Sequence, residues 1–239
     1  MKLGDIYKLA VEMGIKVDPR GKREIDALLK KEKDAYKKLS GNDKADYDKE
    51  RFTNPFADTR ILNGSAGVEV KSLIAGVDME AQELLLADRL REKGEKIDLV
   101  LAHHPEGRSL AALADVMPVQ ADIWHKAGVP INIGEAVLEG RLSEVRRALM
   151  PLNHQRSVAA ARLLDFPFMC VHTPTDNLVT RYLQKYFDCQ GEKNTLDEIL
   201  DKLRSFPEYR ESARENAGPA IVVGKKNRRS GRILVDMTG

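Results

Sequence analysis

Two histidine-bearing segments of the chain have side chains suited to metal chemistry. In LVLAHHP a short apolar run ends in His103 and His104, and in HTPTD the residues His172 and Asp176 follow the apolar run FPFMCV. Imidazole nitrogens and carboxylate oxygens form a ligand set for Zn, Mn or Fe, and a carboxylate can bridge two ions. The residue types therefore predict a divalent-metal site with these four residues as candidate ligands.

The histidine pair requires a strand that ends before it. Residues 97–105, IDLVLAHHP, have the length and apolar character of a buried strand. Adjacent side chains on a regular strand point to opposite faces, so both histidines can serve one site only if the strand has already ended. Pro105 favours such an end, because proline cannot donate to a central ladder.

A strand, helix, strand unit is predicted to carry the first segment. VEVKSLIAGVDM is strand-like, AQELLLADRLREKG helix-like and IDLVLAHH strand-like, and the crossover length suits a parallel pair. If FPFMCV joins the same parallel sheet, both histidine segments lie at one edge and converge. Residues 172–176 would span about 13 Å if extended, so this segment must turn to serve one ion, and Pro174 favours a turn.

The whole pattern predicts an α/β fold with a mixed or mainly parallel sheet flanked by helices. PAIVVG and GRILVDM are expected to be two strands joined by the hairpin connection KKNRRS. Residues 1–60 are interpreted as a helical N-terminal extension and residues 61–239 as the metal-binding domain. Helices are expected near residues 5–14, 22–39, 108–128, 135–149, 152–166, 195–205 and 207–216.

Composition narrows the class of protein. The 239 residues are 42% hydrophobic and 32% charged, as in a globular chain rich in charge. With 39 Lys and Arg against 37 Asp and Glu, the net charge of +2 favours neither nucleic acid nor a membrane as a partner. No apolar stretch approaches the roughly 18 residues of a membrane span, and the first residues lack a signal peptide's apolar core. Two cysteines are too few for a disulfide framework, so the cytoplasm is the expected compartment.

Other polar residues have simpler interpretations. His125 and His154 lie on helix-like segments and are expected to be structural. Asp78, at the end of IAGVD, is expected to cap the following helix, and an approach to the same edge as the histidines is the alternative. Glu106 and Arg108 follow the histidine pair, where they either contact a substrate or phosphate or are ordinary loop charges.

Two remaining motifs offer alternative chemistry. Cys170 lies inside an apolar strand, where a thiol is usually inert, so a dyad of Cys170 with His172 is disfavoured. KKNRRSGR and the Lys-rich residues 22–39 are compatible with an anion or nucleic acid. Because no aromatic residues interleave KKNRRSGR, a solvated hairpin tip is the preferred interpretation.

At these residues the chain resembles the Nif-three-like family of dinuclear-metal proteins, many of which are named GTP cyclohydrolase I type two homologues. The matching motifs are HHP, an HTNLD-type motif present here as HTPTD, and AGVDM where the family has a strand that ends in Asp. The resemblance runs from about Ile74 to Asn177. It implies that His103, His104 and Asp176 are metal ligands with His172 close by, in a toroidal homo-oligomer, a hexamer, whose sites face an interior cavity.

One departure from the family pattern concerns the second half of the site. Family members usually complete the site with a His and a Glu or Asp near the C-terminus, whereas no histidine follows Asp176 in this chain. The chain is therefore expected to lack the final αβ segment of the family. A lost subdomain, a fragmentary sequence and a site with fewer ligands remain open explanations.

Three functional hypotheses follow. The first is a hydrolase in which one or two ions of Zn, Mn, Fe or Ni lower the pKa of a bound water. His103 and His104 would hold the ions and Asp176 would bridge them, and the resemblance implies a small phosphorylated or nucleotide-like substrate. The second is a noncatalytic binding or regulatory module stabilised by its metal. Nucleic-acid binding is the third and is the least favoured, because the net charge is near zero.

Overall fold

The computed structural model describes residues 1–191 and 194–236. Tertiary contacts group the described residues into two compact units, residues 1–181 with Asp236, and residues 182–235. The domain boundary expected between residues 60 and 61 stays a prediction.

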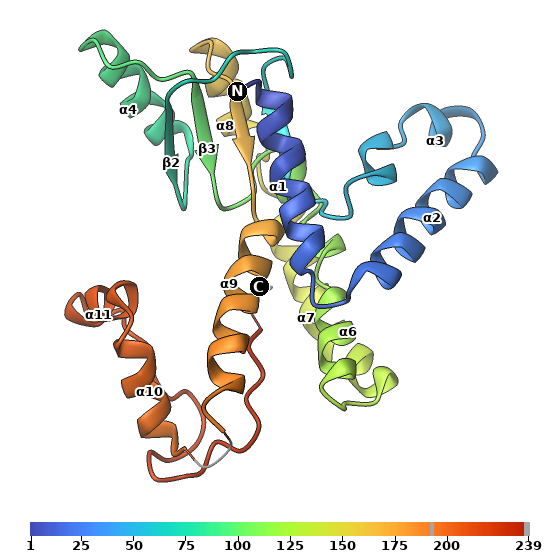
Figure 1. The fold of residues 1–239 in the computed structure, drawn as a ribbon. Coiled ribbons are helices and arrows are strands. Elements are labelled where there is room, and N and C mark those ends of the chain that lie inside the picture. Colours follow the sequence, from blue (N-terminus) through green and yellow to red (C-terminus); the bar gives the residue numbers. More distant parts are fainter. Residues whose placement is uncertain (192–193, 237–239) are drawn as a thin grey trace. The chain divides into compact units, whose positions relative to one another are not determined.

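The first unit contains a four-stranded sheet (Figure 1). Its strands are β1 (Arg60–Asn63), β2 (Leu73–Gly76), β3 (Leu99–Ala102) and β4 (Phe168–Cys170), in the order β1-β4-β3-β2. β3 pairs in parallel with β2 and β4, and β1 is antiparallel to β4. The predicted α/β class with a mixed sheet is confirmed, as is the parallel pairing of the strands before the two histidine segments.

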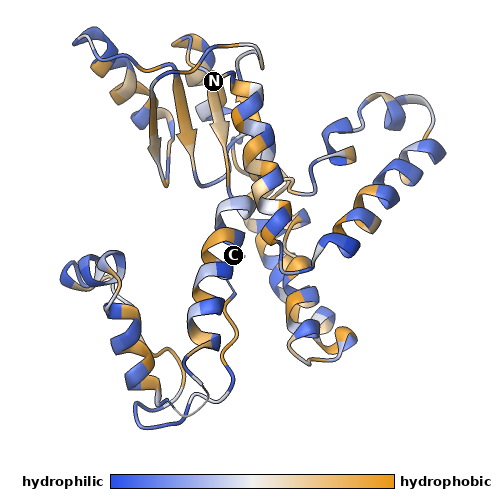
Figure 2. Ribbon diagram, in the orientation of Figure 1, coloured by the Kyte–Doolittle hydropathy of each residue, from blue (hydrophilic) through white to orange (hydrophobic). Residues whose placement is uncertain are grey.

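Helices cover both faces of this sheet. On one face the strands pack with α4 (Ala81–Glu92) and α8 (Arg156–Leu163), and on the other with α1 (Leu3–Val17). Leu99 and Val100 point to opposite faces and are both fully buried, which stabilises the fold by about 1.5–3 kcal/mol per side chain. The two central strands, β3 and β4, are therefore apolar along their length, in agreement with the hydrophobic colouring of the sheet in Figure 2, because a central parallel strand has no solvated face.

Helices account for most of the rest of the first unit. The predicted helix over residues 108–128 is divided into three pieces, and Pro118 is the N-cap residue of the last one. None of the helices in the described ranges is long and apolar enough to cross a membrane. The elements are α2 (Lys22–Lys38), α3 (Gly41–Ala45) and η1 (Lys49–Phe52) before β1, and α5 (Arg108–Ala111), η2 (Leu113–Asp115), α6 (Val119–Lys126) and α7 (Ile131–Leu149) between β3 and α8.

The second unit begins within α9 (Thr173–Asp188) and contains α10 (Leu196–Arg204) and α11 (Pro207–Arg214). Thr195 and Glu198 form a capping box at the start of α10, each side chain accepting from the other's backbone N–H. The helices predicted near residues 195–205 and 207–216 are confirmed.

The strands predicted for PAIVVG and GRILVDM are wrong where the structure describes them. Beyond an isolated bridge, residues 219–236 form no ladder. The first two N–H groups of α10 instead donate to the carbonyl oxygens of Arg228 (2.9 Å) and Lys226 (3.1 Å) in the KKNRRS connection. These N–H groups have no acceptor within the helix, so the loop folds onto the helix start and the flanking runs meet no partner strand among the described residues. Met237 of GRILVDM lies outside those residues.

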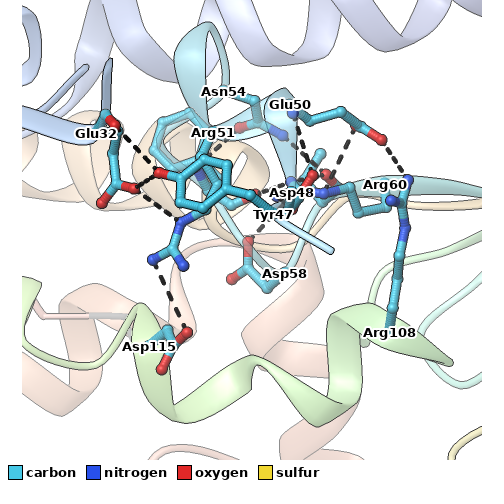
Figure 3. Close-up of polar contacts among 12 residues, drawn as sticks. Glu32, Tyr47, Asp48, Glu50, Arg51, Asn54, Asp58, Arg60, Arg108 and Asp115 are labelled. Atoms are coloured by element: carbon cyan, nitrogen blue, oxygen red, sulfur yellow. Dashed lines mark hydrogen bonds and ion pairs between the residues drawn. The ribbon is translucent and has the colours of Figure 1, made fainter. Parts of the chain in front are cut away.

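A buried arginine holds the loop that leads into β1. Arg60 is almost fully buried, and its Nη1 donates to the carbonyl oxygens of Phe56 (2.5 Å) and Thr59 (2.7 Å). Its Nη2 lies 2.8 Å from Asp48 Oδ2 and its Nε 3.6 Å from Glu50 Oε2 (Figure 3). Burial alone would lower the pKa of Arg60, but the hydrogen bond and the charge of Asp48 raise it. The guanidinium is therefore a permanent cation that ties this loop to η1.

We expect Arg60→Met to lower the free energy of unfolding by about 3–5 kcal/mol, because two backbone carbonyls and two carboxylates lose their cationic partner. The matched control Arg89→Met removes only an exposed ion pair with Glu92. It should change the free energy of unfolding by less than about 1 kcal/mol. Urea unfolding followed by circular dichroism measures both. Equal, small effects of the two substitutions would contradict the structural role of Arg60.

Candidate metal centre

The histidine pair follows β3 directly. β3 ends at Ala102, and the backbone pairing continues for two residues, since His103 N donates to Gly76 O and His104 N to Val77 O, both at 2.9 Å. Their ring centroids are only 5.2 Å apart. The prediction that the strand ends before the pair is confirmed, and both imidazoles are free to serve one site.

The HTPTD segment turns by starting a helix. His172 precedes α9, and its carbonyl oxygen accepts from Thr175 N (2.9 Å) and Asp176 N (3.2 Å). Pro174 lies in this first turn, where a missing N–H leaves no intrahelical bond unmade. The four-residue spacing places His172 and Asp176 one helical turn apart, with His172 Nε2 3.7 Å from Asp176 Oδ2. The predicted turn is thus confirmed as the first turn of α9.

The two segments converge at one edge of the sheet. The ring centroid of His172 lies 4.8 Å from that of His103 and 5.8 Å from that of His104. One ring nitrogen from each of these three histidines lies within 4.8 Å of the others. Asp176 joins the group, since its Oδ1 is 3.4 Å from His103 Nε2. The structure therefore brings all four candidate residues together, while their role as ligands stays a prediction.

Carboxylates orient two of the three imidazoles. His172 Nδ1 lies 3.0 Å from Asp58 Oδ2, and His104 Nδ1 lies 2.6 Å from Asp78 Oδ1. An ionised carboxylate only accepts hydrogen bonds, so Nδ1 of each ring carries the proton and donates it. In the neutral imidazole this leaves the lone pair on Nε2, and a carboxylate behind a ligating histidine is the usual arrangement at metal sites.

Neutral acceptors orient the ring of His103 in the same way, with Nδ1 toward the scaffold. Its Nδ1 lies 3.2 Å from Val171 O and 3.1 Å from Thr175 Oγ1. The single proton of the Thr175 hydroxyl is shared between two carbonyl oxygens, those of Val171 (3.0 Å) and His172 (2.7 Å). With the Val171 carbonyl as its acceptor, Nδ1 carries the proton, and Nε2 is again free. All three imidazoles therefore bind the scaffold through Nδ1 and keep Nε2 for a ligand.

Burial sets the electrostatics of the group. Asp176 is almost fully buried, and burial, together with the charge of Asp58, raises its pKa to about 6 despite the attraction of His172 and His104. Burial and the positive charge of His172 lower the pKa of His103. For His172, burial alone would lower the pKa, but the hydrogen bond and charge of Asp58 outweigh it and raise the pKa.

Sequence reasoning missed one residue of this arrangement and misplaced another. Asp58 lies in a polar stretch with no local signal that it contacts a residue 114 positions away. The prediction that Asp78 caps α4 is wrong, because the N-cap is Glu80, which forms a capping box with Glu83. The alternative, that Asp78 reaches the edge with the histidines, is confirmed by its contact with His104.

The other polar residues named from the sequence lie outside the three-histidine group. His125 is exposed on α6, and His154 is half-buried just before α8. Arg108 pairs with Glu50 of the Arg60 network. Glu106 is half-buried, and burial raises its pKa.

Cys170 is fully buried at the end of β4, where its Sγ donates to Asp58 O at 3.4 Å. Burial raises the pKa of its thiol, in agreement with the expected inert cysteine.

Comparison with known proteins gives a match at the level of fold. The structure is similar to that of a NIF3 superfamily protein from Sphaerobacter thermophilus, with a TM-score of 0.60 and 25% sequence identity. The match covers 72% of this chain and 61% of that chain, so this chain spans about three fifths of the matched protein. No protein-family model and no curated protein sequence matches the chain.

The fold of the similar structure and the geometry of the site lead to the same conclusion. A NIF3 fold and a group of three convergent histidines together support a metal-binding protein. The histidine pair and HTPTD, which carried the resemblance in the sequence, lie at the ends of adjacent parallel strands of this fold. These findings support the assignment of this chain to the NIF3-like family.

Proposed function

We propose that the chain binds one or two divalent ions through His103, His104, His172 and Asp176 and acts as a metal-dependent hydrolase. The observation that carries this proposal is the shared orientation of the three imidazoles, with Nδ1 bonded to the scaffold and Nε2 left for a ligand. Zn, Mn, Fe and Ni all suit nitrogen and carboxylate ligands. The family resemblance of the HHP and HTPTD motifs supports a small phosphorylated or nucleotide-like substrate.

The residues at the site fit a cation. Asp176 is almost fully buried, and among the described residues its cationic partners are histidines and not lysine or arginine. A buried carboxylate without a strong cationic partner is unfavourable, which is why burial raises its pKa. A divalent ion between Asp176 and the Nε2 atoms would supply that partner.

Residues of this chain would orient the candidate metal ligands for the reaction. Asp58 and Asp78 hold the rings of His172 and His104, and the first turn of α9 holds Asp176 beside His103. A divalent ion in such a site acts as a Lewis acid and lowers the pKa of a bound water. The resemblance also supports a homo-oligomer, and the low cysteine content supports a cytoplasmic location; both are included in the proposal.

A second function is supported by one observation. No histidine follows Asp176 in the sequence, so the ligand set available to the ions is small. The alternative is a noncatalytic binding or regulatory module in which the metal stabilises the fold.

Purified wild-type protein should retain Zn, Mn, Fe or Ni, and His103→Ala combined with His104→Ala should reduce the content below about a tenth of an equivalent per chain, because two imidazole ligands are lost. The control His125→Ala changes an exposed histidine on α6 and should leave the content unchanged. Elemental analysis by mass spectrometry measures both. A wild type that binds less than about a tenth of an equivalent after incubation with each metal would contradict the metal site.

Asp176→Asn should stabilise the metal-free protein at neutral pH, by at most about 3 kcal/mol. The pKa of Asp176 is raised to about 6 in the folded chain. Below that value the folded state binds more protons than the unfolded state, so this carboxyl makes wild-type stability fall as pH rises from about 4 to about 6. Urea unfolding of chelator-treated protein should show equal stability near pH 4 and a more stable variant near pH 7. A variant less stable than wild type near pH 7 would argue against the burial penalty.

The hydrolase and the noncatalytic module differ in whether the protein turns over a substrate. A hydrolase should cleave bis(p-nitrophenyl) phosphate or a nucleotide in a panel assay. Chelation should abolish turnover because it removes the metal, and Asp176→Asn should abolish it because the proposed carboxylate ligand is lost. Thermal melting of the same samples gives the second measurement. A large loss of melting temperature on chelation without turnover on any phosphoester or nucleotide would favour the noncatalytic module.

A further inference from the structure

We propose that Asp58 is the positioning residue of this centre, a buried acceptor that fixes the ring of His172 with Nε2 toward Asp176. This inference rests on the proposed metal site and adds a residue that neither motif contains. Asp58 is fully buried, and its Oδ2 accepts from His172 Nδ1 at 3.0 Å. It therefore determines both the proton position and the direction of the imidazole.

The same oxygen is held by a second residue. Asp58 Oδ2 also accepts from Thr173 Oγ1 at 2.5 Å and from Thr173 N at 3.3 Å. Three donors on one oxygen leave it no freedom to rotate away from His172. Because the Thr173 N–H group can only donate, Asp58 Oδ2 is an acceptor, and the His172 Nδ1 atom that faces it carries the proton.

The backbone around Asp58 is anchored on both sides. Thr59 Oγ1 accepts from His172 N at 3.1 Å, and Asp58 O accepts from Cys170 Sγ at 3.4 Å. Arg60 donates to the carbonyls on either side of Asp58, those of Phe56 and Thr59. Figure 3 labels Asp58 beside this network. The buried guanidinium therefore holds the loop that presents Asp58 to the site.

Asp78 provides the contrast within the same centre. It accepts from His104 Nδ1, but its side chain is 66% exposed and that of His104 is 49% exposed. No further hydrogen bond to Asp78 is found among the described residues. An exposed pair competes with water and contributes little, whereas a buried acceptor behind a ligand typically changes metal affinity 10–100-fold. The two aspartates form a matched pair with the same chemistry and different burial.

The test compares Asp58→Asn with Asp78→Asn by competition for Zn²⁺ against a chromophoric chelator. Asn keeps the size of the side chain and one acceptor but removes the charge that supports the imidazole. Asp58→Asn should weaken Zn²⁺ binding about 10- to 100-fold, and Asp78→Asn less than about fivefold. Equal effects of the two substitutions, or unchanged affinity in Asp58→Asn, would overturn the inference.

A second background separates positioning from general stability. If Asp58 acts through His172, then Asp58→Asn in a His172→Gln chain should change the affinity by less than about twofold. Thermal melting of the metal-free variants records any change in the fold alone. A loss of affinity of the same size in both backgrounds would show that Asp58 acts through the fold and not through His172.

A measurement on the wild type covers the case in which Asp58→Asn does not fold. Long-range ¹H–¹⁵N spectra of the histidine rings in metal-free protein should show His172 protonated on Nδ1. An Nε2–H ring in a protein that binds Zn²⁺ would overturn this inference alone. A wild type that binds no Zn²⁺ would overturn the proposed function, and with it the metal role of Asp58.

Discussion

The parallel pairing of β3 with β4 is the constraint on which the candidate site depends. Their register places Ala102 opposite Cys170, and hydrogen-bonded neighbours in a sheet are separated by only about 4.8 Å. His103 follows the first strand at once, and His172 follows the second after one residue. Because both strands run in the same direction, their carboxyl ends lie at the same edge, and side chains far apart in the sequence meet there.

Buried polar groups support this edge of the sheet. Their burial would cost free energy if they lacked hydrogen-bonding partners. Burying an arginine or an aspartate is expensive unless every hydrogen-bonding group is satisfied. Arg60 meets this requirement with two carbonyls and two carboxylates, and Asp58 meets it with a histidine and a threonine. The two networks share the short loop before β1. The interior on this side of the fold is therefore organised to hold one carboxylate behind one imidazole.

The burial of Asp176, unlike that of Arg60 and Asp58, is not offset by strong hydrogen-bonding or ionic partners. Asp176 is buried with weak cationic partners, and its pKa is raised to about 6, so in the metal-free protein its ionised form opposes folding. A local arrangement that lowers stability without compensation is typical of functional sites. The same burial would strengthen the attraction between Asp176 and a divalent ion, because water is excluded.

From the sequence alone, the three parallel strands and the two halves of the site could be predicted. Apolar runs of four to eight residues predicted β2, β3 and β4, but the polar residues of β1 and of α9 gave no such signal. HHP and HTPTD at the strand ends predicted His103, His104, His172 and Asp176, all of which lie together. The carboxylate that orients His172 could be identified only from the folded chain, because Asp58 and His172 are 114 positions apart and no periodicity relates them. It also excluded the hairpin around KKNRRS, because in the part of the chain that the structure describes the strand-like residues have no partner strand and the loop binds the start of α10. Strand character is local, but hydrogen-bond partners are supplied by whichever segments the fold brings near.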